Sequence, residues 1–387
     1  GGIKDSLIVV VGTDECTYYT KSMTIHSEKF GGIDGRCVSV VLDDHDVTFG
    51  SAEKVQEAFK EIIEEYRPQC VFLVTTCVIE IIGDDFDAIS EGLSELYGIP
   101  VLPVHTEHFK CEDHLPGLER TITVCAEMMK SCDSDNSVNL LGQRMGDFAT
   151  TELYAMLQKA GVKIGLQLPC GCSVDDIKNA AAAKVNIVVN DIALPLAQKM
   201  QEKFGIPYVY FNKFVIPEKI YEAYKNLFGY LELELPGELE GLYQNAREKI
   251  EKNKGELEGI TYIYGNTPYA VFEMNCFLSS LGMVPQVIQT NRYTEADEPY
   301  AKEILQYTDP YVCKAANIAP LQYVYDVLSP YLYLGHEFGN RLRQKGIAIV
   351  HSDRASGMLG FEVTGYLLQQ LVKSVREAKE YRKELGL

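Results

Sequence analysis

Short apolar runs alternate with amphipathic helical stretches along almost the whole chain, and this alternation most constrains the fold. The first set of apolar runs covers residues 6–12, 37–42, 70–77 and 101–105. Between two of them lies the helical pattern AEKVQEAFKEIIEEY (52–66). Strands that alternate with helices in this way are typical of βαβ units, whose strands pair in parallel.

The same alternation occurs twice more. A polar break (130–137) precedes a second set of apolar runs, at 138–142, 162–169, 185–189 and 208–211. A charged helical linker (238–259) precedes a third set, at 260–265, 284–290, 331–335 and 347–352. We therefore predict an α/β protein of three Rossmann-like, doubly wound parallel-sheet domains, with boundaries at 1–135, 136–237 and 238–387. In such folds ligands bind at the carboxyl ends of the strands.

Composition narrows the class of protein. The formal net charge of the 387 residues is −19, which argues against a nucleic-acid partner because phosphates require a basic surface. The eleven cysteines, an odd number, and the absence of an export signal indicate the reducing cytoplasm. No apolar stretch approaches the length of a membrane span. Because the sequence opens at Gly1 close to its first apolar run, we expect a segment upstream of it.

Nucleotide-binding motifs are missing. The sequence has neither a GxxxxGK[ST] phosphate loop nor a GxGxxG turn after a strand. We therefore expect no nucleotide on this chain, and the strand-end crevices of the three domains must hold something else.

Three cysteines of the first domain lie at strand ends. Cys16 and Cys77 each follow a predicted core strand, and Cys37 opens another. Neighbouring parallel strands bring their carboxyl ends together, so we expect Cys16 and Cys77 to share one edge of the sheet. Thiolates gathered at such an edge suit zinc or an iron–sulfur cluster. The alternative is that these are buried structural thiols.

Other chemistry-bearing residues follow later strands. PCGCS places Cys170 and Cys172 between a strand and a helix that begins near Ser173, and Ser173 with Asp176 resembles a capping box. Because a helix amino terminus lowers a thiol pKa, Cys172 is a candidate reactive thiol or cluster ligand, with a plain tight turn as the alternative. His351 follows the last strand. Its side chain either faces an interdomain crevice or makes a structural hydrogen bond.

The stretch HTEHFKCEDH (105–114) repeats histidine or cysteine every third residue. This spacing matches no standard zinc finger. We expect a polar loop here, with a zinc site as the alternative.

Several long motifs resemble those of one known family. GGIKDS with VVVGTDECTYY, CVSVVLDDHDVTFGSAEKVQEA, and above all TTCVIEIIGDDFDAI resemble the nitrogenase component 1-type proteins. That family comprises the α and β subunits of the molybdenum–iron protein, cofactor-assembly scaffold paralogues, and components of dark protochlorophyllide reductase and of the F430 reductive cyclase. The resemblance covers nearly the whole chain and implies the three-domain fold.

The resemblance implies roles for particular residues. Cys16 and Cys77 match two cysteines that bind an iron–sulfur cluster, 4Fe–4S or larger, at the subunit interface. The position of the family's remaining ligand cysteine would fall upstream of Gly1, so either the natural chain is longer or this protein lacks that ligand. Cys37 matches a β-type cysteine that is not a ligand, and we keep it only as a substitute metal ligand. Asn190 stands where the catalytic α subunit has the cysteine that anchors the iron–molybdenum cofactor, so dinitrogen reduction with that cofactor is not expected.

The function that the resemblance implies is the electron-accepting, catalytic component of an ATP-dependent two-component reductase, a cytoplasmic oxidoreductase. Its partners would be an ATP-dependent iron–sulfur reductase, similar to the nitrogenase iron protein, and an identical or homologous subunit. The substrate or cofactor crevice would be lined by Asn190, Cys170, Cys172 and His351. The alternative is a non-catalytic scaffold for metallocluster assembly, and a third option is a paralogue that has lost its clusters.

Overall fold

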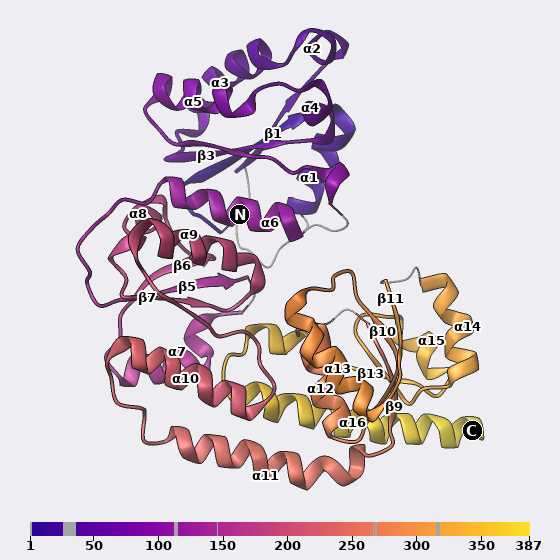
Figure 1. Cartoon of the computed structure of the whole chain (residues 1–387). Coiled ribbons are helices and arrows are strands. Elements are labelled where there is room, and N and C mark those ends of the chain that lie inside the picture. The colour runs from indigo at the N-terminus through magenta and orange to yellow at the C-terminus, as the bar shows by residue number, and fades with distance from the viewer. Residues whose placement is uncertain are drawn as a thin grey trace. The chain divides into compact units, whose positions relative to one another are not determined.

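The structure is a computed structural model that describes residues 2–25, 36–111, 115–144, 146–265, 267, 269–314 and 318–387. Within these ranges the chain forms three parallel sheets, each flanked by helices (Figure 1). The predicted fold class, α/β with three doubly wound parallel sheets, is confirmed.

The first sheet has the strand order β2-β1-β3-β4. Its strands are β1 (Ser6–Gly12), β2 (Cys37–Val41), β3 (Cys70–Thr75) and β4 (Val101–Val104). Its helices are α1 (Asp14–Ile25), α2 (Asp44–Phe49), α3 (Ala52–Tyr66), α4 (Cys77–Ile82) and α5 (Phe86–Tyr97). Apolar residues of α3 recur every three to four positions, so that Val55, Phe59 and Ile62 form one face, which is buried in the core of this sheet.

The second sheet has the order β6-β5-β7-β8. Its strands are β5 (Val138–Gln143), β6 (Ile164–Pro169), β7 (Val185–Val188) and β8 (Tyr208–Tyr210). The nearby helices are α6 (Leu115–Thr123), α8 (Val174–Lys178) and α9 (Leu194–Phe204). Short 3-10 turns are η2 (His108–Lys110), η3 (Val124–Glu127), η4 (Phe148–Thr150), η5 (Ala180–Ala182) and η6 (Asp191–Ala193).

The third sheet has the order β11-β10-β9-β12-β13. Its strands are β9 (Thr261–Tyr264), β10 (Val284–Gln289), β11 (Tyr311–Cys313), β12 (Leu332–Leu334) and β13 (Ala348–Val350). Its helices are α12 (Val271–Ser280), α13 (Glu298–Tyr307), α14 (Ile318–Leu328), α15 (Gly339–Arg343) and α16 (Glu362–Leu385), with η7 (Glu295–Asp297) and η8 (Asp353–Gly357). The remaining helices are α7 (Glu152–Lys159), α10 (Pro217–Leu231) and α11 (Leu239–Leu257).

Every predicted strand is present, with bounds within one or two residues of the predicted ones. Strand β11 was not predicted. It is three residues long, lies at the sheet edge and is largely exposed, so it lacks the buried apolar run that marks the other strands.

The chain divides into two compact units. One consists of Gly1–Met145 and Gly161–Tyr210, and the other of Gly146–Ala160 and Phe211–Leu387. In the first unit the first two sheets share a core, in which Phe72 and Leu102 pack with Leu141 and Leu166. The boundaries of the three predicted domains stay a prediction. Among the described helices, none combines the length and the apolar content needed to cross a membrane.

Candidate functional site

Two thiols meet at the carboxyl edge of the first sheet. Cys16 lies in the first turn of α1, which follows β1, and Cys77 is the first residue of α4, which follows β3. Strands β1 and β3 pair in parallel, with Val11 opposite Thr75. As a result the two Sγ atoms lie 3.6 Å apart, and both side chains are partly exposed.

The position is a topological switch point. Strand β1 pairs with β2 on one side and with β3 on the other, so the connections that leave β1 and β3 run in different directions from adjacent strand ends. In doubly wound sheets this is where a ligand-binding crevice forms.

The immediate surroundings of the thiols fit a soft metal or cluster. Burial, together with the neighbouring Cys16 thiol, raises the pKa of Cys77, so a metal that binds this thiol must displace its proton. The Oγ1 atom of Thr76 is buried and has no hydrogen-bond partner among the described residues. A Cβ added at Gly12 would lie 2.0 Å from that oxygen, so only glycine fits here. A pair of partly exposed thiols at the carboxyl edge of a sheet suits an iron–sulfur cluster.

The motif EIIGDD after Cys77 builds the scaffold of this edge. Glu80 Oε1 accepts hydrogen bonds from Thr75 Oγ1 (2.9 Å) and from the Glu107 amide (2.5 Å). Asp84 Oδ2 accepts from the amide and the hydroxyl of Ser51, the residue that precedes α3. Asp85 caps α5 by accepting from the Ala88 amide at 2.9 Å. The carboxylates of the motif therefore hold helices and loops around Cys77.

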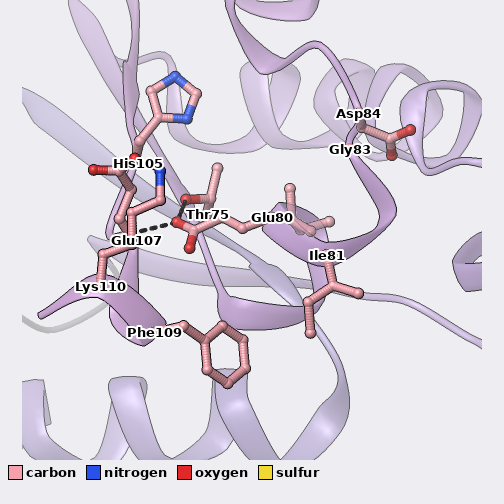
Figure 2. A pocket seen from close by; sticks show the side chains of 10 residues that line it. Thr75, Glu80, Ile81, Gly83, Asp84, His105, Glu107, Phe109 and Lys110 are labelled. Carbon is pink, nitrogen blue, oxygen red and sulfur yellow. Dashed lines mark hydrogen bonds and ion pairs between the residues drawn. The ribbon is translucent and has the colours of Figure 1, made fainter.

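A pocket of about 390 Å³ lies beside α4 (Figure 2). Its polar groups are already engaged: Glu80 binds Thr75 and the Glu107 amide, and Glu107 pairs with Lys110 and Arg120. These two cations hold the pKa of Glu107 below its usual value. Figure 2 shows Phe109 and Ile81 directed away from the Glu80 network. We find no free catalytic group among the pocket residues that these contacts involve.

Large apolar side chains are exposed around the thiol pair. They come from α1, the end of α2, α4 and η2: Tyr18, Tyr19, Phe49, Ile81 and Phe109, each 65–77% exposed. Exposed apolar side chains that gather into one patch are typical of protein–protein interaction sites. We call these five residues the apolar rim.

Cys37 does not join the pair. It is buried at the amino end of β2, in register with Ile8, whereas Gly12 at the carboxyl end pairs with Val41. At about 3.3 Å per residue this register places Cys37 about 13 Å from the carboxyl edge.

The PCGCS turn differs from expectation at one residue. The capping box of Ser173 and Asp176 is present at the start of α8. The expected low pKa of Cys172 is wrong, because burial among apolar side chains raises it to about 12. Cys170 is half-buried, and its Sγ donates to the main-chain oxygen of Arg144 at 3.6 Å.

The other predicted crevice residues lie at strand ends. Asn190 follows β7, and its side chain accepts from the Ile192 amide. His351 follows β13 in the second compact unit; its side chain is exposed and its main-chain oxygen accepts from Tyr366. The crevice shared by these residues stays a prediction.

Two other groups of residues have metal-ligand side chains. In the 105–114 stretch, His105 contacts Asp87, whereas His114 and the side chain of His108 lie outside the described part. Asp43, His45 and Asp46 group their ligand atoms within 4.8 Å. Asp43 and Asp46 form the capping box of α2, which accounts for this grouping.

The fold and site define an α/β protein of three parallel sheets with a paired-thiol site at a sheet switch point. The chain belongs to the family described as "Nitrogenase component 1 type Oxidoreductase", whose sequence profile matches residues 1–376. The resemblance noted in the sequence is thereby confirmed.

Individual relatives of known name support this family membership. The chain is 32% identical over 212 residues to the nitrogenase iron-molybdenum cofactor biosynthesis protein NifE of Clostridium pasteurianum, covering 54% of this chain and 46% of that protein. It is 25% identical over 298 residues to the nitrogenase molybdenum-iron protein alpha chain of Methanosarcina barkeri, covering 73% and 56%. The chain thus spans about half the length of the curated relatives it matches.

The solved structure "Nitrogenase Cp1 at pH 6.5" has the same fold. It superposes with a TM-score of 0.81 at 15% identity, covering 98% of this chain and 90% of that one.

Proposed function

We propose that the chain is an iron–sulfur protein, the electron-accepting component of an ATP-dependent two-component reductase. The observation that carries the proposal is the 3.6 Å separation of the Cys16 and Cys77 sulfurs at a sheet switch point. An iron–sulfur cluster bound there, 4Fe–4S or larger, would supply one-electron transfer at low potential. Cys16 and Cys77 would hold it as thiolates.

The pair also implies a partner subunit. Two thiols supply only part of the four-cysteine set that such clusters use, so further ligands must come from elsewhere. The apolar rim surrounds the thiols and gives an identical or homologous subunit a surface to bury. We propose that the cluster lies at this subunit interface.

The ATP-hydrolysing step belongs to a separate iron–sulfur reductase that delivers electrons to this cluster. The sequence of this chain carries no phosphate-binding loop. Electrons would pass on to a substrate bound at the strand ends near Asn190 and Cys170. Because Asn190 stands where the catalytic α subunit anchors its cofactor, we do not propose dinitrogen reduction.

A second candidate function is assembly of a metallocluster that is then transferred to another protein. It is favoured by several relatives of this chain, which are nitrogenase iron-molybdenum cofactor biosynthesis proteins. The same thiol pair and the same fold would serve this role.

Iron and sulfide content and an EPR spectrum of anaerobically purified protein test the proposal. We expect a cluster in the parent protein that is lost in Cys16→Ala and Cys77→Ala. The exposed Cys132, whose thiol donates to the Asn179 main-chain oxygen, provides the control variant Cys132→Ala, which should keep its iron. Protein that holds no iron after reconstitution would contradict both candidate functions.

Two further assays separate the candidates. Turnover that requires a partner reductase, ATP and an electron donor supports the reductase. Transfer of the cluster to an acceptor protein, without turnover, supports the scaffold.

A further inference from the structure

Two buried tyrosines pack against one another in the third sheet. Tyr325 lies on α14 and Tyr333 on β12, and the two residues are 1% and 4% exposed. Their rings meet edge to face, with the centroids 5.9 Å apart. They belong to an apolar core cluster that also contains Ile263, Val287 and Leu321. The two phenol rings are therefore in direct contact and shielded from water.

The Tyr325 hydroxyl is hydrogen-bonded to a carboxylate. It donates to Glu337 Oε2 at 3.2 Å, while Glu337 Oε1 accepts from the Phe338 amide at 2.7 Å. The second hydrogen bond holds the carboxylate in its orientation. Glu337 lies in the connection that follows β12 and is partly exposed, so a proton that it accepts is released to water.

The surroundings of Tyr325 determine how its phenol loses an electron. Burial, followed by the neighbouring Tyr333 and Glu337, raises the pKa of Tyr325 above the ordinary value of a phenol. The phenol therefore keeps its proton at neutral pH. Because a phenol becomes a strong acid once it loses an electron, that loss is favoured where a base within hydrogen-bond reach takes the proton. Glu337 is a base in that position.

The contact between two phenols distinguishes this position from another buried tyrosine–glutamate pair. Tyr224 donates to Glu152 at 3.0 Å, but its ring contacts Phe211 and Phe361. A phenylalanine ring is much harder to oxidise than a phenol. The sequence has 24 tyrosines and no tryptophan, so phenols are the aromatic side chains that this chain offers to an oxidant.

We propose that Tyr325 is a redox-active tyrosine, which gives one electron to a radical oxidant derived from dioxygen while its phenolic proton passes to Glu337. The O–H bond of Tyr325 breaks, the oxidant is reduced by one electron, and a neutral tyrosyl radical remains. The proton forms a new O–H bond with Glu337 Oε2. The electron and proton of the Tyr333 hydroxyl would in turn restore the Tyr325 phenol and move the radical to Tyr333. This chemistry goes beyond the proposed function and needs no cluster.

Photo-oxidation followed by freeze-quench EPR tests the proposal. Ruthenium(III) tris-bipyridine, generated by a laser flash in the presence of persulfate, serves as the one-electron oxidant. We expect a long-lived tyrosyl signal whose hyperfine pattern changes when 3,5-difluorotyrosine replaces the residue at position 325. Tyr325→Phe should lose the long-lived signal. The control is Tyr323→Phe, at a tyrosine that is 78% exposed on the same helix, and it should keep the signal.

Two further variants test the roles of the neighbours. Glu337→Gln keeps an acceptor for the Phe338 amide but removes the base, so radical formation should slow about a hundredfold or more, the usual contribution of a positioned base. Tyr333→Phe keeps the ring contact and removes the second phenol, so the radical should stay on the labelled ring at position 325. Urea unfolding shows whether each variant is folded.

Three results would overturn the proposal: a signal that does not respond to the label at position 325, an equal signal in the parent and in Tyr325→Phe, or an unchanged rate in Glu337→Gln. The same experiment on Cys77→Ala separates this proposal from the proposed function. That variant should lose its iron and still form the radical. A radical that disappears together with the cluster would also overturn the proposal.

Discussion

The sulfur atoms of Cys16 and Cys77 lie 3.6 Å apart, although 61 positions separate the two residues in the sequence. The parallel pairing of β1 with β3 produces this approach, because each cysteine follows its strand at the same edge of the sheet. The thiols are close enough to react with one another when nothing else binds them.

Iron-free protein should therefore form a Cys16–Cys77 disulfide under mild oxidation. Glutathione disulfide would accept the two electrons and leave as two molecules of glutathione, while the two protein thiols become one disulfide. We expect a loss of two titratable thiols and a peptide pair that links residues 16 and 77 in mass spectrometry. Protein that holds its cluster should be protected, and Cys16→Ala should not form this link. Equal oxidation with and without iron would count against cluster binding at the pair.

Gly12→Ala should disturb the thiol site by steric overlap. Its new Cβ would lie 2.0 Å from Thr76 Oγ1, so Thr76 must move, and Cys77 follows it directly in the chain. We expect a loss of about 1–3 kcal/mol in the free energy of unfolding, together with reduced iron content. The matched control is Gly92→Ala, in α5, where a Cβ meets nothing within 4 Å. That variant should keep its iron and gain up to about 1 kcal/mol. Full iron content in Gly12→Ala would show that the site tolerates displacement of Thr76.

The adjacent aspartates of EIIGDD should differ in their effect on stability. Asp84→Ala removes two hydrogen bonds and leaves the buried amide and hydroxyl of Ser51 unsatisfied, at a cost of about 2–3 kcal/mol. Asp85→Ala removes the cap of α5, at a cost of about 1 kcal/mol. Asp84→Asn retains an acceptor and should fall between Asp84→Ala and the parent. Urea unfolding measures the free energy of unfolding of each variant. A larger loss of stability in Asp85→Ala than in Asp84→Ala would contradict the roles given to the two aspartates.

Much of the fold could be predicted from the sequence because buried parallel strands are continuous apolar runs. The pairing of Cys16 with Cys77 followed from the same rule, since both follow such runs. The exposed edge strand β11 carried no such signal.

At Cys172, by contrast, the rule that a helix amino terminus lowers a thiol pKa predicted the wrong direction of the pKa shift. Its position before a helix suggested a low pKa, yet burial in the apolar core that also holds Cys70 and Cys125 raises the pKa.

Glu152 and Glu362 hold the starts of α16 and α7 in a reciprocal arrangement within the second compact unit. Glu152 Oε1 accepts from the Phe361 amide and from the Tyr224 hydroxyl, both at 3.0 Å, while the Glu152 amide donates to Glu362 Oε1 at 3.2 Å. Burial, and to a lesser extent the charge of Glu362, raises the Glu152 pKa above its ordinary value.

This raised pKa predicts a pH dependence of stability. The folded protein binds the Glu152 proton more tightly than the unfolded chain does, so this contribution to stability is complete below the ordinary pKa of about 4.3. It is lost as the pH rises through the raised value, at about 1.4 kcal/mol for each unit of the shift. Glu152→Gln keeps the side-chain oxygen that accepts both hydrogen bonds and removes the buried charge. The variant should therefore lack this loss of stability with rising pH, and it should be at least as stable as the parent at neutral pH.

Urea unfolding of the parent and of Glu152→Gln at a series of pH values measures the difference. Glu248→Gln, a change at an exposed glutamate of α11, serves as the control and should follow the parent at every pH. If Glu152→Gln instead kept the pH dependence of the parent and lost stability at neutral pH, the ionised carboxylate would be a favourable partner of Phe361 and Tyr224. The free-energy cost of burying the charge of Glu152 would then be smaller than the stabilisation from the hydrogen bonds that its carboxylate accepts.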